Sequence, residues 1–212
     1  MGTPSLSDTP RVEIARLLLL CHGATRATRT AAFPMEEPVE ARDLAATAAL
    51  AGYLPPVGRV LVSPAACARQ TAAALGLAAR EEPALRDCDW GRWRGRTLDA
   101  VTATEPEAAA LWLADPDAAP HGGESLAALV RRVGSWMDGS GAPSGRILVV
   151  THPAVIRAAL VHALGGPIAC FWRIDVAPLS VVELRRHAAR WSLRTGCMLP
   201  LKRSIGPARS PG

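Results

Sequence analysis

The 212-residue sequence lacks any long uninterrupted apolar run, although 49% of its residues are hydrophobic. The first ten residues contain no lysine or arginine, and the apolar run that follows them is only a few residues long. A membrane-spanning helix needs about 20 consecutive apolar residues, and a secretory signal needs a basic start. We therefore expect no signal peptide, no membrane span and no membrane partner.

Cysteine is scarce, and no two cysteines are close together in the sequence. The five of them lie at positions 21, 67, 88, 170 and 197, without a Cys-x-x-Cys pair. An odd, widely spaced set is not a disulfide framework and suits a reducing compartment. We therefore expect a cytoplasmic protein.

The sequence also lacks a block of like charge. Its net charge of +5 comes from 24 basic and 19 acidic residues, and the arginines stand singly or in short pairs. This scattering argues against a nucleic-acid partner. The richest basic stretch, 202–209, lies among glycine, serine and proline, which predicts a flexible basic tail over 199–212. We expect a disordered segment over 1–11 and one domain over 12–198.

Three short apolar runs are present, and they predict strands buried on both faces of a parallel sheet: 16–21, 58–63 and 146–151. Alanine-rich stretches of helical composition lie between and beyond them: 40–52, 65–75, 106–113, 125–137 and 154–164. This alternation predicts an α/β fold, a three-layer α/β/α sandwich around a mostly parallel sheet. In the last third we expect a strand over 171–176 and a hairpin formed by 180–184 and 191–194.

Reactive side chains follow each of the three predicted strands. Cys21 and His22 end the first, Cys67 follows the second by four residues, and His152 follows the third. Ligands of open α/β sheets bind beyond the carboxyl ends of the strands. We therefore expect two histidines and two cysteines at one edge of the sheet.

Five segments resemble, in order and spacing, the motifs of the histidine phosphatase (phosphoglycerate mutase-like) superfamily. Cys21-His22-Gly23 matches Arg-His-Gly, 63–71 matches Ser-Pro-x-x-Arg-Ala-x-x-Thr, and 151–157 matches Thr-His-Gly-x-Ile-Arg. The stretch 85–97 resembles the loop that carries the general acid, and 122–125 reads Gly-Gly-Glu-Ser as in the family. Together these segments cover roughly 16–194, so the resemblance implies the phosphoglycerate mutase-like fold.

The resemblance also implies roles for individual residues. His22 would be the phosphorylated nucleophile of a phosphomonoesterase, and His152 would stabilise the transferring oxygens. Asp87 would be the general acid, although the family's usual residue there is glutamate. This reaction takes a small phosphorylated molecule and needs no cofactor.

Both phosphate-binding arginines of the family are cysteine in this sequence, at Cys21 and Cys67. A thiol cannot replace the bidentate guanidinium. By analogy with the loss of one transition-state donor, each replacement is expected to cost about 3 kcal/mol, or a factor of ~100 in rate. The phosphatase activity is therefore expected to be weak or altered, unless an arginine such as Arg26 beyond the His22 loop compensates.

The same replacements open three other readings. If the four side chains converge, then Cys21, His22, Cys67 and His152 form a ligand set for zinc or copper(I). A Cys21–Cys67 disulfide is possible if the two Cα atoms lie within about 7 Å. The two cysteines are alternatively apolar filler in a catalytically inactive relic that acts as an interaction module. The sequence sets neither the substrate nor the oligomeric state.

Overall fold

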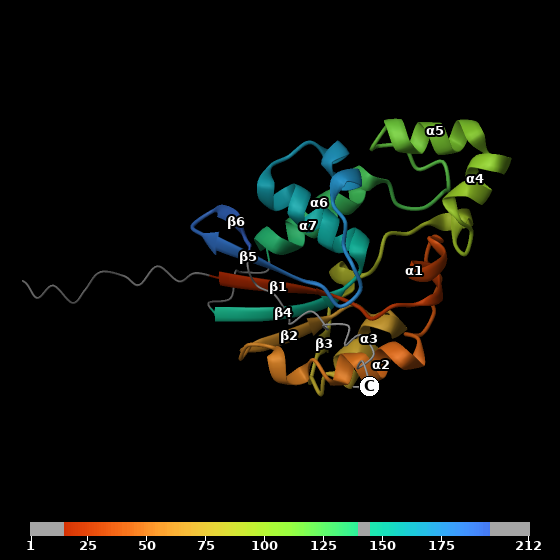
Figure 1. Ribbon diagram of the computed structural model, residues 1–212. Coiled ribbons are helices and arrows are strands. Elements are labelled where there is room, and N and C mark those ends of the chain that lie inside the picture. Colours follow the sequence, from red (N-terminus) through yellow and green to blue (C-terminus); the bar gives the residue numbers. More distant parts are fainter. Residues whose placement is uncertain (1–14, 140–144, 196–212) are drawn as a thin grey trace, which may run out of the picture.

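The computed structural model describes residues 15–139 and 145–195 of the protein (Figure 1). The segment expected to be disordered, 1–11, and the expected basic tail, 199–212, lie outside the described residues. The described residues contain a six-stranded sheet with the order β3-β2-β4-β1-β5-β6. No helix within these two ranges is long and apolar enough to span a membrane.

The three predicted apolar strands form the parallel centre of this sheet. They are β1 (Ala15–Cys21), β2 (Arg59–Val62) and β4 (Gly145–Thr151), and β4 lies between the other two. The register pairs Cys21 with Thr151, so the residues that follow β1 and β4 emerge side by side. A short parallel strand, β3 (Arg80–Glu81), adds to β2 at the edge of the sheet.

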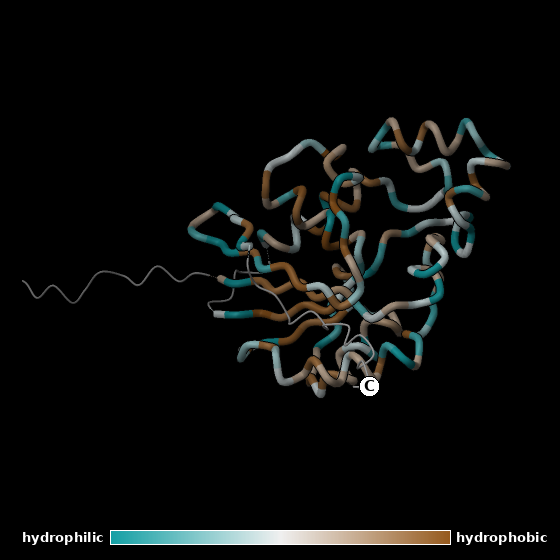
Figure 2. The backbone as a smooth tube through the Cα atoms, viewed as in Figure 1, coloured by the Kyte–Doolittle hydropathy of each residue, from teal (hydrophilic) through white to brown (hydrophobic). Residues whose placement is uncertain are grey.

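Side chains of β1 alternate between two cores on opposite faces of the sheet. Leu17 and Leu19 belong to one buried cluster, whereas Leu18 and Leu20 belong to the other. Figure 2 shows the central strands as the most hydrophobic part of the chain. Helices α6 and α7 cover the first face and α2 and α3 the second, which gives the predicted α/β/α sandwich (Figure 1).

The predicted helices are present, with one interruption and two additions. Their bounds are α1 (Arg26–Thr30), α2 (Ala41–Ala48), α3 (Ala66–Ala74), α4 (Leu98–Thr104), α5 (Pro106–Ala114), α6 (Leu126–Gly139) and α7 (Pro153–Leu164). The helix predicted over 40–52 ends at Ala48 and continues as a 3₁₀ turn, Ala51–Tyr53. The short helices α1 and α4 were not predicted.

The strand predicted over 171–176 is wrong. Ile168–Arg173 forms a 3₁₀ helix instead, because Phe171 is buried in the core beneath Arg157 while its neighbour Trp172 faces outward. The predicted hairpin is confirmed and is longer than expected, with β5 (Val181–His187) antiparallel to β1 and β6 (Arg190–Arg194) antiparallel to β5.

Candidate active site

A cavity of about 1170 Å³ lies at the carboxyl ends of β1, β2 and β4. His22 enters it directly after β1, Pro64 and Ala65 after β2, and His152 after β4. The sheet therefore brings together loops that are far apart in the sequence, as the predicted strand ends require. Helix α1 and the loop around Asp87 complete the wall.

His22 is buried, with 3% of its surface exposed, and its orientation is fixed. Its Nδ1 donates to the carbonyl oxygen of Gly23 over 2.7 Å, which leaves the lone pair on Nε2. The amide of Gly23 donates in turn to Thr71 Oγ1 on α3 at 3.0 Å. Burial, followed by the proximity of His152, lowers the pKa of His22 to about 4. The imidazole is therefore neutral, as a nucleophile must be, at neutral pH.

His152 packs edge-on against His22, with ring centroids 5.1 Å apart and an interplanar angle of 70°. It stands immediately before α7, whose first helical position is Pro153, a residue that has no backbone N–H to leave unpaired there. Its Nε2 lies 2.8 Å from the Ser63 hydroxyl oxygen, and its Nδ1 lies 3.6 Å from a carboxylate oxygen of Asp87. Burial lowers the pKa of His152 to about 4.

Asp87 lies at the cavity beside His152, as the resemblance implies. Its Oδ1 accepts a hydrogen bond from the Cys88 amide at 2.8 Å, and 17% of its side chain is exposed. Burial raises the pKa of this carboxyl to about 6. About a tenth of it is therefore protonated at pH 7, and most of it at pH 5, so the group can donate a proton in mild acid.

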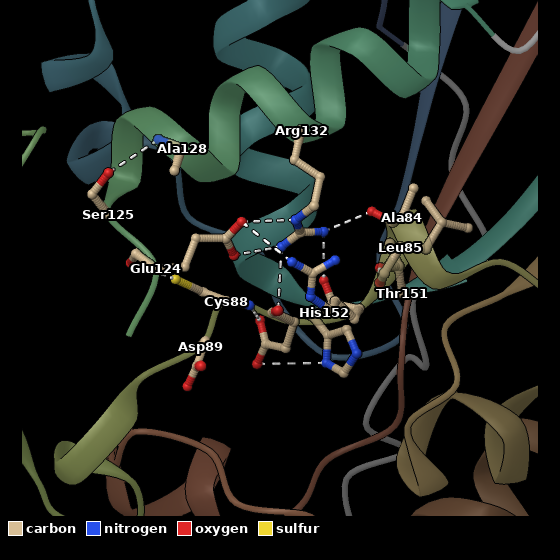
Figure 3. A network of polar contacts seen from close by, with 12 residues as sticks. Ala84, Leu85, Cys88, Asp89, Glu124, Ser125, Ala128, Arg132, Thr151 and His152 are labelled. Carbon is tan, nitrogen blue, oxygen red and sulfur yellow. Dashed lines mark hydrogen bonds and ion pairs between the residues drawn. The ribbon is translucent and has the colours of Figure 1, made fainter. Parts of the chain in front are cut away.

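Arg132 on α6 anchors the loop that carries Asp87 (Figure 3). Its guanidinium forms a bidentate pair with Glu124 at 2.8 and 2.6 Å, and it donates to the carbonyl oxygens of Ala84, Arg86 and Asp87. Both charged side chains are nearly buried. The sequence motifs include the Gly-Gly-Glu-Ser segment but do not indicate a role for Arg132. The sequence shows it only as a charged residue within a mostly apolar predicted helix.

Two glycines let the acid loop contact the Gly-Gly-Glu-Ser segment directly. A Cβ on Gly91, whose φ is +47°, would lie 2.1 Å from the His121 carbonyl oxygen. A Cβ on Gly123 would lie 1.9 Å from the Asp89 carbonyl oxygen. These glycines allow backbone-to-backbone contact, and the amide of Glu124 adds a 2.7 Å hydrogen bond to Asp89. The loop that carries Asp87 is thus held by Arg132 on one side and by the Gly-Gly-Glu-Ser segment on the other.

The two cysteines at the family's arginine positions are not equivalent. Cys67 lines the cavity from the first turn of α3, whereas Cys21 is fully buried in the core cluster and does not line it. Both thiols are free, so the possible Cys21–Cys67 disulfide is not formed. Burial raises the pKa of Cys67 to about 12 and also raises that of Cys21, so both thiols are neutral.

Three of the four possible metal ligands come together. One donor atom from each of His22, Cys67 and His152 lies within 4.8 Å of the other two, and all three residues are buried. Cys21 does not belong to this group. The structure thus reduces the candidate ligand set to two imidazoles and one thiol.

The expected compensating arginine is not at the cavity. Arg26 is exposed and is not among the lining residues. Of the arginines that do line the cavity, Arg69 pairs with Glu81 at 3.3 Å and Arg94 with Asp89 at 2.7 Å. Arg157 donates to the carbonyl oxygen of Ile174.

Carboxylates outnumber guanidinium groups around the cavity. The lining includes five acidic residues and four arginines: Glu36, Glu37, Asp87, Asp89 and Asp175 against Arg69, Arg86, Arg94 and Arg157. Glu36 accepts from the Ala66 amide at the start of α3 at 2.7 Å, and Glu37 accepts from the Ala27 amide in α1. Internal carboxylates therefore occupy helix ends that favour anions.

Aromatic rings form one wall of the cavity. Trp112 and Trp172 meet edge-to-face with centroids 4.6 Å apart, and Trp90 and Phe33 line the same wall. Trp93, in contrast, is fully buried in the core. The wall offers an apolar, aromatic surface in the same cavity as the two histidines.

The α/β sheet and the two histidines beyond its strand ends agree with the resemblance seen in the sequence motifs, and comparison with known families gives the same class of protein. The model of the histidine phosphatase superfamily (branch 1) matches residues 17–197. The chain therefore belongs to the histidine phosphatase superfamily.

The chain is similar to several mycobacterial proteins. A bifunctional protein of Mycobacterium tuberculosis is 32% identical over 187 residues, covering 82% of this chain and 51% of the relative. The chain thus spans about half the length of the first curated relatives it matches. A glucosyl-3-phosphoglycerate phosphatase of Mycolicibacterium vanbaalenii is 30% identical over 176 residues, covering 74% and 77% of the two chains. The solved structure of a protein called mycobacterial hydrolase 1 has a TM-score of 0.76 at 25% identity, covering 88% of this chain and 100% of the other.

Proposed function

We propose that the protein slowly hydrolyses phosphomonoesters through a phosphorylated His22. The observation that carries this proposal is the neutral His22 imidazole, whose Nδ1 is held by Gly23 and whose Nε2 lone pair is free. Nε2 attacks phosphorus while the ester P–O bond breaks, and protonated Asp87 gives its proton to the leaving oxygen. Water then attacks phosphorus and breaks the P–N bond, and the Asp87 carboxylate accepts the proton from that water.

The proposed rate is low because the pocket lacks the two arginines that neutralise phosphate in the family. Transfer of a phosphoryl group depends almost entirely on positioning and charge stabilisation. Backbone amides at the starts of α3 and α7 remain near the cavity and favour an anion. These amides support residual activity, although the carboxylate of Glu36 accepts from the first turn of α3.

We further propose a substrate whose ester group is flat and apolar, because Trp112 and Trp172 wall the cavity. Two relatives are named for glucosyl-3-phosphoglycerate and for α-ribazole phosphate. A panel of aryl, nucleoside and sugar phosphates that includes these two compounds would test both points.

The four free thiols among the described residues support our expectation of a cytoplasmic location.

The test is turnover of this panel with a chelator present and a His22→Ala variant purified in parallel. The expected result is turnover above that of the variant, together with an acid-labile phosphoenzyme in the wild type alone. Equal rates for the two proteins would overturn the proposal. The inactive interaction module would then become the better account, and restoring arginine at the cysteine positions would show whether the remaining machinery is intact.

Soft-metal binding is a second candidate function of the same pocket. It is favoured by the grouping of His22, Cys67 and His152, although Cys21, its fourth expected ligand, lies outside that group.

A further inference from the structure

The three grouped side chains fit a zinc-type ion. Their donor atoms lie within 4.8 Å of one another. Tetrahedral zinc, with Zn–N of about 2.0–2.1 Å and Zn–S of about 2.3 Å, places its donor atoms about 3.3–3.6 Å apart. Side-chain rotations that move the donors by about 1 Å close this difference. We propose that His22, Cys67 and His152 bind one thiophilic divalent cation such as Zn²⁺, in competition with the phosphoryl group.

The surroundings of both imidazoles resemble those of metal-bound histidines. A ligating histidine usually directs its second ring nitrogen to a carbonyl or carboxylate oxygen. Nδ1 of His22 donates to the Gly23 carbonyl, and Nδ1 of His152 faces Asp87 at 3.6 Å. Nε2 of each ring is therefore the ligand atom. On His152, the bond to the ion replaces the 2.8 Å contact with Ser63, whose hydroxyl keeps its contact with the Ala65 amide.

The charge around the cavity favours a cation. Five carboxylates and four arginines line it, and three of those arginines are already paired with acidic side chains: Arg69 with Glu81, Arg86 with Glu124, and Arg94 with Asp89, which is one of the five. When the ion binds, Cys67 releases its proton to solvent. The resulting thiolate neutralises one of the two positive charges of the ion. A pocket that held phosphate with two arginines would have the opposite charge balance.

Three protein ligands leave the fourth position of a tetrahedral ion for water or another small ligand from the cavity. Cys21 is not needed, because it lies outside the donor group. The competition rests on the proposed function in one respect, namely that His22 Nε2 is the attacking atom. The same lone pair cannot bind the ion and attack phosphorus, so the ion is expected to inhibit hydrolysis.

The experiment is anaerobic equilibrium dialysis of the full chain against Zn²⁺, with metal and protein quantified, followed by Co²⁺ substitution. We expect one Zn²⁺ per chain and an intense sulfur-to-cobalt charge-transfer band in the near ultraviolet. In Cys67→Ala the band is lost and affinity falls by more than about 100-fold, since even the loss of an outer partner costs 10–100-fold. Cys21→Ala and Cys170→Ala are matched controls, and both are expected to keep the ion and the band.

The opposite results overturn the inference. Substoichiometric zinc in the wild type, or an unchanged charge-transfer band in Cys67→Ala, would show that the three residues do not form the site. If Cys67→Ala does not fold, X-ray absorption of the wild-type zinc protein decides, because one sulfur and two imidazoles are expected in its coordination shell. Hydrolysis measured with chelator tests the proposed function separately, so either proposal can fail alone.

Discussion

Restoring arginine at Cys67 is expected to raise phosphatase activity by about 100-fold. Cys67 lines the cavity beside the two histidines, and a guanidinium there would reach the transferring oxygens. One positioned transition-state donor is worth about 3 kcal/mol, which corresponds to a factor of about 100 in rate. The carboxylates of Asp87 and Glu36 act on the Cys67 thiol, so they would also stabilise a positive charge at this position.

Arginine at Cys21 is expected to behave differently. Cys21 is fully buried, does not line the cavity, and belongs to the same core cluster as Leu17 and Leu19. An arginine there requires space that the core does not provide and buries a charge among leucines. We expect Cys21→Arg alone to destabilise the fold by about 3 kcal/mol or more. The two family positions therefore have to be restored in order, Cys67 first.

The assay is kcat/KM on the best substrate of the phosphate panel. Every reaction contains chelator, so that relief of metal inhibition cannot be mistaken for an increase in phosphatase activity. Cys67→Gln is the neutral control. Cys67→Lys tests whether the single charge of an ammonium group can replace the bidentate guanidinium of arginine. We expect the order Arg, then Lys, then Gln. A folded Cys67→Arg protein no faster than Cys67→Gln would refute the assignment of this position to phosphate binding.

Three other predictions follow from the pKa values and contacts of the site. Since His22 must be neutral and Asp87 protonated in the free enzyme, kcat/KM is expected to fall below about pH 4 and above about pH 6, and to be roughly ninefold higher at pH 5 than at pH 7. A flat profile from pH 5 to 8, or an alkaline limb that survives in Asp87→Asn, would contradict these roles. Arg132→Ala is expected to lower the free energy of unfolding by about 3 kcal/mol in urea titration, because it removes the bidentate partner of the nearly buried Glu124 and leaves only Arg86, at 3.8 Å. The exposed Arg131→Ala control should change it by less than about 0.5 kcal/mol. Glu36→Gln removes a carboxylate from the start of α3 and should tighten inhibition by inorganic phosphate about two- to fivefold, so an unchanged inhibition constant would count against its role there.

The centre of the fold could be predicted because its strands are buried on both faces. An apolar run as short as Leu17–Leu20 fits a strand buried on both faces better than a helix, because buried helices are usually longer. The positions of His22 and His152 then follow from the parallel arrangement. The strand predicted over 171–176 was wrong because Phe171 is buried by a 3₁₀ helix that ends at Arg173. A run of that length does not distinguish these two conformations.

The site was only partly predictable because its chemistry depends on packing between distant segments. The sequence motifs placed Asp87 at the cavity, but its raised pKa comes from burial and its position from Arg132, 45 residues away. The difference between Cys21 and Cys67 also lies in packing. Both positions match an arginine in the family pattern, yet only one lines the cavity.

On both proposals, the side chain at position 67 sets which charge the pocket prefers. With a neutral thiol the lining has five carboxylates and four arginines; arginine at this position balances it, and a thiolate raises the excess of negative charge to two. Two unit charges 4 Å apart interact by about 4 kcal/mol at the effective dielectric constant of a protein surface, about 20. The exchange of one side chain therefore changes the preference between phosphate and a divalent cation by more than the about 3 kcal/mol assigned to one phosphate donor. We therefore propose that loss of the family's arginine at this position changes the sign of the ion that the two histidines are best placed to bind, and the zinc titration tests this directly.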